Sequence, residues 1–394
     1  MAKPEIRLKG FEEKWVEMPF SKMVTRVSTS GNTKDYPGVE FEDIVSGEGV
    51  LNKDVVAKNI NKVGKCFDVG DVLFGKLRPY LKNILLADFK GVAVGDFWVL
   101  RPDKIDSNLL YTLVSSSSFM KVANISAGSK MPRADWNLVS SSYFSIPNSR
   151  EEQSKIAAYF KSLDSMVLAT KKMIAQLKQI KTSSLISMFP QAGESKPRVR
   201  FKGFEGEWEK VKLGTLTERI NRKSGSDSNA PVMMISASSG FIEQSEKYSS
   251  DNAGKSLQNY TLLYKGELAY NHGASKLRQY GSCFELHVEE ARIPYVYHCF
   301  RMKDGNSTFF AYYLNSGIFD PELRKIVSST ARMDGLLNIS YEAYMSIDVY
   351  KCSLAEQEKI ASFFKSLDKQ ISLQEQRLEK LKQIKSACLD KMFV

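Results

Sequence analysis

The chain has 394 residues, of which 43% are apolar, and it contains 22 Phe and 17 Tyr. This composition can build folded cores and excludes a disordered chain. Lys and Arg number 56 against 45 Asp and Glu, so the formal net charge is +11 at pH 7. A basic excess of this kind favours a polyanionic partner, such as nucleic acid or an anionic membrane face.

Features that the sequence lacks exclude other classes of protein. No apolar stretch approaches the roughly 18 residues that a membrane helix needs, and residues 1–11 hold no signal-peptide core. The five cysteines are odd in number and widely spaced, and adjacent residues such as His298 and Cys299 make poor ligand geometry on a strand. We therefore expect a soluble, cytoplasmic protein with reduced thiols and no metal site.

An internal repeat organises the chain. The segment from Pro4 to Trp15 returns as Pro197 to Trp208, at an offset of 193. Residues 149–190 align without gaps on 353–394, at an offset of 204. The rising offset is typical of a duplication whose middle has diverged by insertions. The pattern predicts a pseudo-two-fold tandem repeat of one unit, because two copies are too few for a solenoid.

The first globular region, residues 20–148, contains short runs of β-branched and aromatic residues between turns. The runs at 92–94 and 97–100 predict strands, and 109–122 predicts a helix. Two loops carry cations beside apolar side chains. Because Arg can grip guanine and Lys can hold phosphate, these loops predict DNA contacts. The alternative is an ordinary solvated turn with Tyr80 in the core. The candidate residues are Lys76, Arg78, Tyr80, Lys130 and Arg133.

A long helix is predicted next, over residues 149–190. No Gly or Pro occurs from 151 to 188, and apolar residues recur at steps of three and four, as in a coiled-coil seam. Ser149 followed by Glu152 predicts a capping box, and Pro190 predicts the end of the helix. The second copy predicts the same helix over 353–394. The seam residues that we single out, also as a candidate partner-docking surface, are Ile156, Phe160, Leu163 and Leu177, with Ile360, Phe364, Leu367 and Leu381.

Residues 191–200 form a short linker to the second globular region, 201–352. Runs at 232–235 and 295–297 predict strands, and 309–315 predicts a helix. Its main candidate loop adds Asn, which reads adenine, to the cations of the first copy. An ordinary satisfied surface histidine remains an alternative for His272, and a core position for Tyr280. The candidate DNA-binding residues are Asn271, His272, Lys276, Arg278, Tyr280 and Arg332.

The short linker constrains how the helices run. A helix of about 38 residues is roughly 57 Å long, so the second globular region should begin near the far end of the first helix. If the matching seams bury each other, the second helix runs back antiparallel, and a parallel bundle is the alternative. The expected fold is α+β, with two mixed α/β domains separated by two long antiparallel helices.

No catalytic motif accompanies these elements. The sequence contains no P-loop, no complete dinucleotide-binding glycine pattern, and no Asn/Asp-Pro-Pro-Tyr/Phe tetrapeptide of adenine methyltransferases. The main hypothesis is therefore a protein that recognises DNA sequence and catalyses no reaction. Two rivals remain: a stand-alone nuclease or methyltransferase, and a coiled-coil scaffold with protein-binding domains.

The whole chain resembles the specificity subunits of type I restriction-modification systems. The resemblance is carried by Glu-Gln-x-Lys-Ile-Ala-x-x-Phe-x-x-Leu-Asp, which opens both helices at Glu152 and Glu356, and by Phe-x-Gly-Phe-Glu-x-x-Trp over residues 201–208. The first copy of the second motif has Leu8 where the motif has Phe.

This resemblance implies a division of labour along the chain. Residues 1–148 and 201–352 would be target-recognition domains, each reading one half of a split double-stranded DNA site. The helices 149–190 and 353–394 would set the unread gap and dock two methyltransferase subunits. Those partners would bind S-adenosylmethionine and methylate adenine, and restriction (motor-nuclease) subunits would join for cleavage. The chain itself would hold no cofactor and carry out no catalysis.

Overall fold

A computed structural model describes residues 4–58, 61–125, 131–226, 228–244, 254–327 and 337–393. The chain divides into two compact units. Unit 1 comprises Met1–Met173 and Gln374–Val394, and unit 2 comprises Ile174–Leu373. Each of the two long helices, α4 (Arg150–Ser187) and α9 (Leu354–Met392), therefore contributes one part to each unit.

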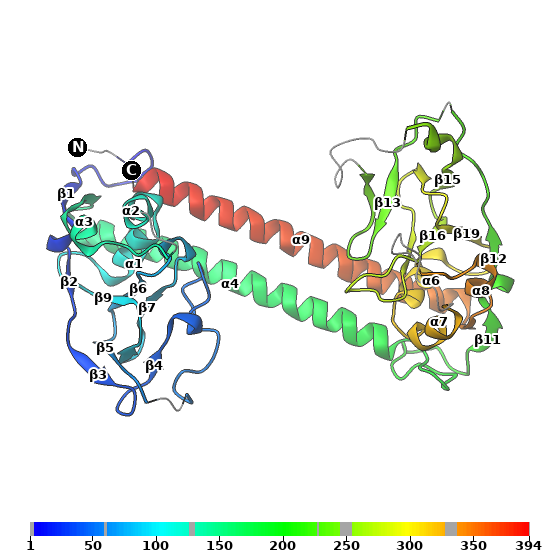
Figure 1. The fold of residues 1–394 in the computed structure, drawn as a ribbon, viewed down its shortest axis with the longest axis horizontal. Helices are drawn as coiled ribbons and strands as arrows, with labels where there is room; N and C mark the ends of the chain where they lie inside the picture. The colour runs from blue at the N-terminus through cyan, green and yellow to red at the C-terminus, as the bar shows by residue number, and fades with distance from the viewer. Residues whose placement is uncertain are drawn as a thin grey trace. The chain divides into compact units, whose positions relative to one another are not determined.

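Unit 1 combines two four-stranded sheets with short helices (Figure 1). One sheet has the strand order β2-β9-β6-β7 and the other has β3-β5-β8-β4, while β1 pairs with β10 in a separate antiparallel ribbon. The elements before α4 are β1 (Val16–Pro19), β2 (Val24–Arg26), β3 (Ser30–Asn32), β4 (Gly38–Val39), β5 (Val63–Phe67), β6 (Val72–Gly75), β7 (Ile84–Leu86), β8 (Gly91–Ala93), β9 (Phe97–Pro102), α1 (Ser107–Ser115), α2 (Ser117–Ala123), α3 (Trp136–Ser141), β10 (Tyr143–Ile146) and the 3-10 helices η1 (Phe20–Lys22), η2 (Phe41–Asp43) and η3 (Pro79–Leu81).

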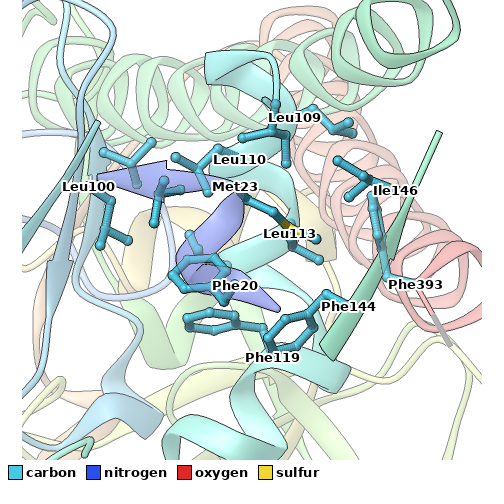
Figure 2. Packing of buried hydrophobic residues seen from close by; sticks show 14 of the residues in the cluster. Phe20, Met23, Leu100, Leu109, Leu110, Leu113, Phe119, Phe144, Ile146 and Phe393 are labelled. Atoms are coloured by element: carbon cyan, nitrogen blue, oxygen red, sulfur yellow. The ribbon is translucent and has the colours of Figure 1, made fainter. Parts of the chain in front are cut away.

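The main core of unit 1 joins the globular part to both long helices. Phe20, Phe119 and Phe144 pack with tilted and edge-on rings, and Phe393 from the end of α9 lies beside Ile146 (Figure 2). These side chains are almost completely withdrawn from solvent, and burying each stabilises the fold by about 1.5–3 kcal/mol. The end of the chain is thus part of the first core.

The two long helices are antiparallel within unit 1. The first part of α4 meets the last part of α9, where the Tyr159 hydroxyl lies 3.4 Å from the Cys388 sulfur and Lys385 pairs with Asp164. Near the start of the chain, the Glu5 amide donates to the carbonyl of Lys391 at 2.8 Å. The same antiparallel pairing occurs within unit 2, where Lys181 of α4 lies 2.5 Å from Asp368 of α9. The parallel bundle is excluded in each unit.

Unit 2 repeats this plan. Its four-stranded sheet has the order β12-β19-β16-β17, which matches β2-β9-β6-β7 strand for strand, and β11 pairs with β20 as β1 does with β10. Two further antiparallel pairs, β13-β14 and β15-β18, stand where unit 1 has its second sheet. The elements are β11 (Glu209–Lys212), α5 (Leu213–Leu216), β12 (Thr217–Arg219), β13 (Met233–Ser236), β14 (Gly240–Glu243), η5 (Gly254–Asn259), β15 (Thr261–Tyr264), β16 (Leu268–Asn271), β17 (Ser282–Glu285), β18 (Glu290–Ile293), β19 (His298–Met302), α6 (Ser307–Leu314), α7 (Asp320–Ile326), α8 (Tyr341–Met345) and β20 (Asp348–Lys351). The predicted α+β tandem fold is confirmed.

Two local predictions need correction. The helix predicted over 109–122 is two helices, because the Ser116 side chain accepts from the Phe119 amide and starts α2 anew. The strand predicted over 295–297 is a turn, in which the Tyr297 amide donates to the Pro294 carbonyl at 3.0 Å. Proline fixes its own φ and has no N–H, so it starts a turn readily, and β19 begins only at His298.

The two repeated lead-in segments, Pro4 to Trp15 and Pro197 to Trp208, each bind to one of the long helices. The Arg7 guanidinium donates to both carboxylate oxygens of Glu152, at 2.6 and 2.7 Å, and Arg200 does the same to Glu356 at the same distances. Both carboxylates are buried. Only half of the predicted capping box therefore forms at the start of α4. The Ser149 hydroxyl accepts from the Glu152 amide at 3.4 Å, but the Glu152 carboxylate binds Arg7 and not the backbone at the helix start.

The predicted seam residues lie inside the two cores. Ile156, Phe160 and Leu163 belong to the core of unit 1, and Ile360, Phe364 and Leu367 belong to that of unit 2. Leu177 and the partly buried Leu381 pack against the same two cores. The helical spacing therefore serves packing against each globular part as well as against the other helix, and a partner would meet other side chains of the helices.

Candidate nucleic-acid interface

The two candidate loops of unit 1 lie side by side. Leu77 and Arg133 form an antiparallel bridge, the Arg78 amide donates to the Pro132 carbonyl at 2.8 Å, and the Ala134 amide donates to the Lys76 carbonyl at 2.9 Å. Residues that are more than 50 positions apart in the sequence thus form one surface. Nothing in the local pattern of either loop predicted this pairing.

The paired loops of unit 1 carry more positive than negative charge. Lys76 and Arg133 approach Asp96, at 3.4 and 3.1 Å, and share that single carboxylate. Arg78 is exposed and has no carboxylate partner among the described residues. Exposed ion pairs are weak, so a phosphate can compete with Asp96 for both cations.

Backbone strain also marks this loop. Arg78 and Lys82 have φ values of 49° and 52°, and no other non-glycine residue in the described part of the chain has a positive φ. Left-handed backbone costs a side-chain-bearing residue energy and is found most often at functional sites. Between them Pro79 is buried, whereas Tyr80 remains 56% exposed, so Tyr80 is not a core residue.

In the part of the chain that the structure describes, the corresponding loop of unit 2 presents fewer exposed cationic side chains. A tight turn is closed by two bonds between Ser275 and Arg278, which place Lys276 and Leu277 in solvent at its tip. Arg278 is half-buried, and its Nε finds no hydrogen-bond partner among the described residues. Burial lowers the pKa of Arg278, while Asp320 opposes the shift. Tyr280 is partly buried against the core of unit 2.

Two residues of unit 2 that were predicted to contact DNA, His272 and Asn271, form hydrogen bonds within the protein instead. His272 is 4% exposed, and its ring nitrogens lie 2.6 and 2.9 Å from the carbonyl oxygens of Leu337 and Val296. The Asn271 amide donates to the Ile235 carbonyl, and its oxygen accepts from the Gly273 amide. We therefore withdraw His272 from the candidate contacts and assign it to the support of the loop. Lys130 and Arg332 lie outside the described residues.

Sequence reasoning missed two exposed arginines near these loops. The Arg26 guanidinium lies 4.6 Å from the centre of the Trp136 ring, and that of Arg219 lies 4.3 Å from the Tyr341 ring. A signal was present in the sequence, because Arg26 and Arg219 repeat at the offset of 193 that relates the two lead-in segments. Their aromatic partners differ and are far away in the sequence, so the repeat alone did not identify them.

Among the described residues, no group of three or more His, Cys, Asp and Glu side chains is placed to hold a metal ion. None of the helices in that part of the chain is long and apolar enough to cross a membrane.

Known proteins share this arrangement. Residues 22–179 match the family model of the type I restriction modification DNA specificity domain. The crystal structure of a type I restriction-modification S subunit from M. genitalium superposes with a TM-score of 0.62 at 12% identity, covering 100% of this chain and 99% of that chain. A chain solved in work on complex assembly and conformational transition of the type I R-M system gives a TM-score of 0.51 at 18% identity, covering 97% and 98%. No curated protein matches the sequence.

Fold and family match together define the class of protein: one that recognises DNA sequence. Residues 22–179 carry the DNA specificity domain of type I restriction-modification systems, and the fold of the whole chain is similar to that of the S subunit from M. genitalium.

Proposed function

We propose that each unit reads one half of a bipartite DNA sequence, and that the chain supplies recognition without catalysis. The observation that carries the proposal is the bridge between Leu77 and Arg133, which gathers Lys76, Arg78 and Arg133 on one surface of unit 1. Arginine can bind guanine through two hydrogen bonds, and lysine can hold the backbone beside it. The loop at Lys276 has the corresponding role in unit 2.

The outer faces of the long helices are the proposed docking surface for two methyltransferase subunits. Ile180 of α4 and Ile384 of α9 occupy equivalent positions in the repeat, and they are 48% and 37% exposed. Exposed apolar side chains that recur at matching positions suit a partner that binds each copy alike. A structural neighbour solved in work on complex assembly of a type I R-M system supports partners of this class.

The chemistry belongs to those partners in this proposal. The methyltransferase subunits bind S-adenosylmethionine and methylate adenine, and restriction subunits cleave DNA. The specificity subunit needs no cofactor of its own. Because these reactions act on the cell's own DNA and on incoming DNA, the complex works in the cytoplasm.

A base-resolution map of adenine methylation tests the proposal. A host without its own methylation receives this chain, its methyltransferase, or both. One split motif that appears only with both proteins is the expected result. Methylation by this chain alone would show an active site of its own, and the absence of any motif, together with no DNA binding by the complex, would favour a scaffold.

A further inference from the structure

Both units hold an arginine over an aromatic ring. In unit 1, Arg26 at the end of β2 covers Trp136, and Trp136 meets Trp98 of β9 edge-on, with ring centres 5.2 Å apart. In unit 2, Arg219 at the end of β12 covers Tyr341, and Tyr341 meets His298 of β19 edge-on, at 5.7 Å. Each arginine thus ends a short chain of stacked and edge-on rings.

The two arrangements correspond position by position. Arg26 and Arg219 each end the first strand of matching sheets, and Trp136 and Tyr341 are the first residues of α3 and α8. The aromatic partner has changed from Trp to Tyr, but the arginine and its stacking have remained. An interaction kept while its partner changes indicates that the placement of the guanidinium matters in both units.

Both arginines are exposed and able to bind an anion. No ion pair joins Arg26 to any carboxylate in the described part of the chain, and Arg219 pairs with the exposed Glu342 at 3.2 Å. A guanidinium held over a ring by cation–π attraction keeps N–H groups that can donate to an anion. A guanidinium fixed in this way loses less side-chain freedom when it binds a phosphate.

Packed rings connect each arginine to the strands that lead to the candidate loop of its unit. In unit 1, the Lys76 amide donates at 2.8 Å to the carbonyl of Asp96, two residues before Trp98. In unit 2, the ring of His298 stacks on that of His272, at 5.0 Å, where the second loop begins. A duplex lying on the loops would therefore pass near the arginine of the same unit.

We propose that Arg26 and Arg219 are phosphate-binding sites for the backbone of duplex DNA, one in each unit. This assignment rests on the proposed function. The candidate loops share Lys-Leu-Arg-x-Tyr but present it differently, because Arg78 is exposed and Arg278 is half-buried, whereas Arg26 and Arg219 are both exposed over a ring. Phosphates are the part of DNA that does not change with sequence, so a shared contact fits the backbone and positions each unit for reading.

Substitution in the complex with the methyltransferase tests the assignment. Affinity is measured at several salt concentrations for a duplex with the mapped motif and for a scrambled duplex. The double variant Arg26→Ala/Arg219→Ala should bind both duplexes more weakly, by about 10-fold or more, and the slope of log affinity against log salt should fall by about two. Arg26→Lys/Arg219→Lys, which keeps the charge but weakens the stacking, should give an intermediate loss.

A matched control is present in unit 2. Arg301 lies on the neighbouring strand, is similarly exposed and pairs with Glu218 at 2.8 Å. Adjacent strand residues point to opposite faces, so Glu218 and its partner Arg301 lie away from Arg219. Arg301→Ala removes one positive charge, as each half of the double variant does, and should leave both affinities within about twofold.

The outcomes separate the two proposals. Unchanged binding by the double alanine variant, or a loss confined to the motif duplex with no change in salt slope, would overturn the phosphate assignment. A concurrent loss of motif binding in Lys76→Ala/Arg78→Ala would show that the proposed function still holds. If the wild-type complex does not distinguish the two duplexes, the proposed function itself fails.

Discussion

At the scale of single residues, Trp15 and Trp208 hold equivalent places in units 1 and 2, but their indole N–H groups differ. Trp15 Nε1 donates to Glu152 at 3.1 Å, whereas the buried Nε1 of Trp208 meets no partner among the described residues. A hydrogen bond to a charged group contributes about 1.5–3 kcal/mol, and an unpaired buried donor costs energy. The same residue therefore stabilises one unit more than the other.

This asymmetry gives a prediction with an internal control. Trp15→Phe should lower the free energy of unfolding of unit 1 by about 1.5–3 kcal/mol more than Trp208→Phe lowers that of unit 2, because only the first change breaks a bond to a carboxylate. Calorimetric unfolding of both variants measures the difference. Equal losses would mean that the Glu152 contact contributes nothing.

His298 links stability to pH. Burial lowers its pKa below the ordinary 6.5, the Ile339 carbonyl opposes the shift, and His272 and Arg219 add to it, with Glu342 opposing. As the pH falls, His298 is therefore protonated in the unfolded chain before it is protonated in the folded unit 2. The stabilising contribution is complete above about pH 7 and is lost as pH falls through 6.5 towards the folded pKa.

Replacing His298 with Gln should remove this part of the pH dependence. The urea midpoint of unit 2 can be followed by Trp208 fluorescence with the tryptophans of unit 1 changed to Phe. In the parent protein it should fall between pH 7 and pH 5.5 more steeply than in His298→Gln. Identical slopes in the two proteins would contradict the assignment.

At the scale of elements, the long helices have two kinds of apolar residue. Phe160 is 1% exposed and lies beside Phe393, whereas Ile384 of α9, also in unit 1, is 37% exposed. The first kind holds the helices against the core, and the second is available to a partner. Sequence spacing alone did not separate them, because both recur at helical intervals.

Substitution should separate these roles. Phe160→Ala should destabilise unit 1 by about 3–5 kcal/mol through the cavity that it leaves. Ile384→Ala should change stability by less than about 0.5 kcal/mol but weaken methyltransferase binding about tenfold. Thermal unfolding and titration with the methyltransferase measure the two effects, and wild-type partner affinity in Ile384→Ala would place the docking surface elsewhere.

Elements with strong local signals were predictable, and contacts between distant segments were not. The long helices follow from apolar spacing without Gly or Pro, and all the predicted seam residues are buried except Leu381, which is partly buried. The bridge from Leu77 to Arg133 depends on how two loops fold together, and no spacing encodes it. The burial of His272 likewise depends on carbonyl groups of residues 296 and 337, which lie far along the chain.

At the scale of the whole molecule, we propose that helix length sets the gap between the two half-sites. Inserting about four residues, one helical turn of about 6 Å, into both α4 and α9 should lengthen the gap by one or two base pairs. Both half-site sequences should stay the same, since the loops are untouched. Methylation mapping reads the result, and an altered half-site sequence would refute the spacer role.

The participation of Phe393 in the core of unit 1 affects how the protein is made. Unit 2 is continuous from Ile174 to Leu373, so all its residues are synthesised before Met392 and Phe393. Unit 1 needs Met392 and Phe393 to cover Trp15 and Phe160, although most of it is synthesised first. On the ribosome the later unit can therefore complete its folding before the earlier one, and unit 1 keeps an apolar surface uncovered until Met392 and Phe393 have been made. Loss of Met392 and Phe393 by truncation would damage unit 1, although most of unit 1 precedes unit 2 in the sequence.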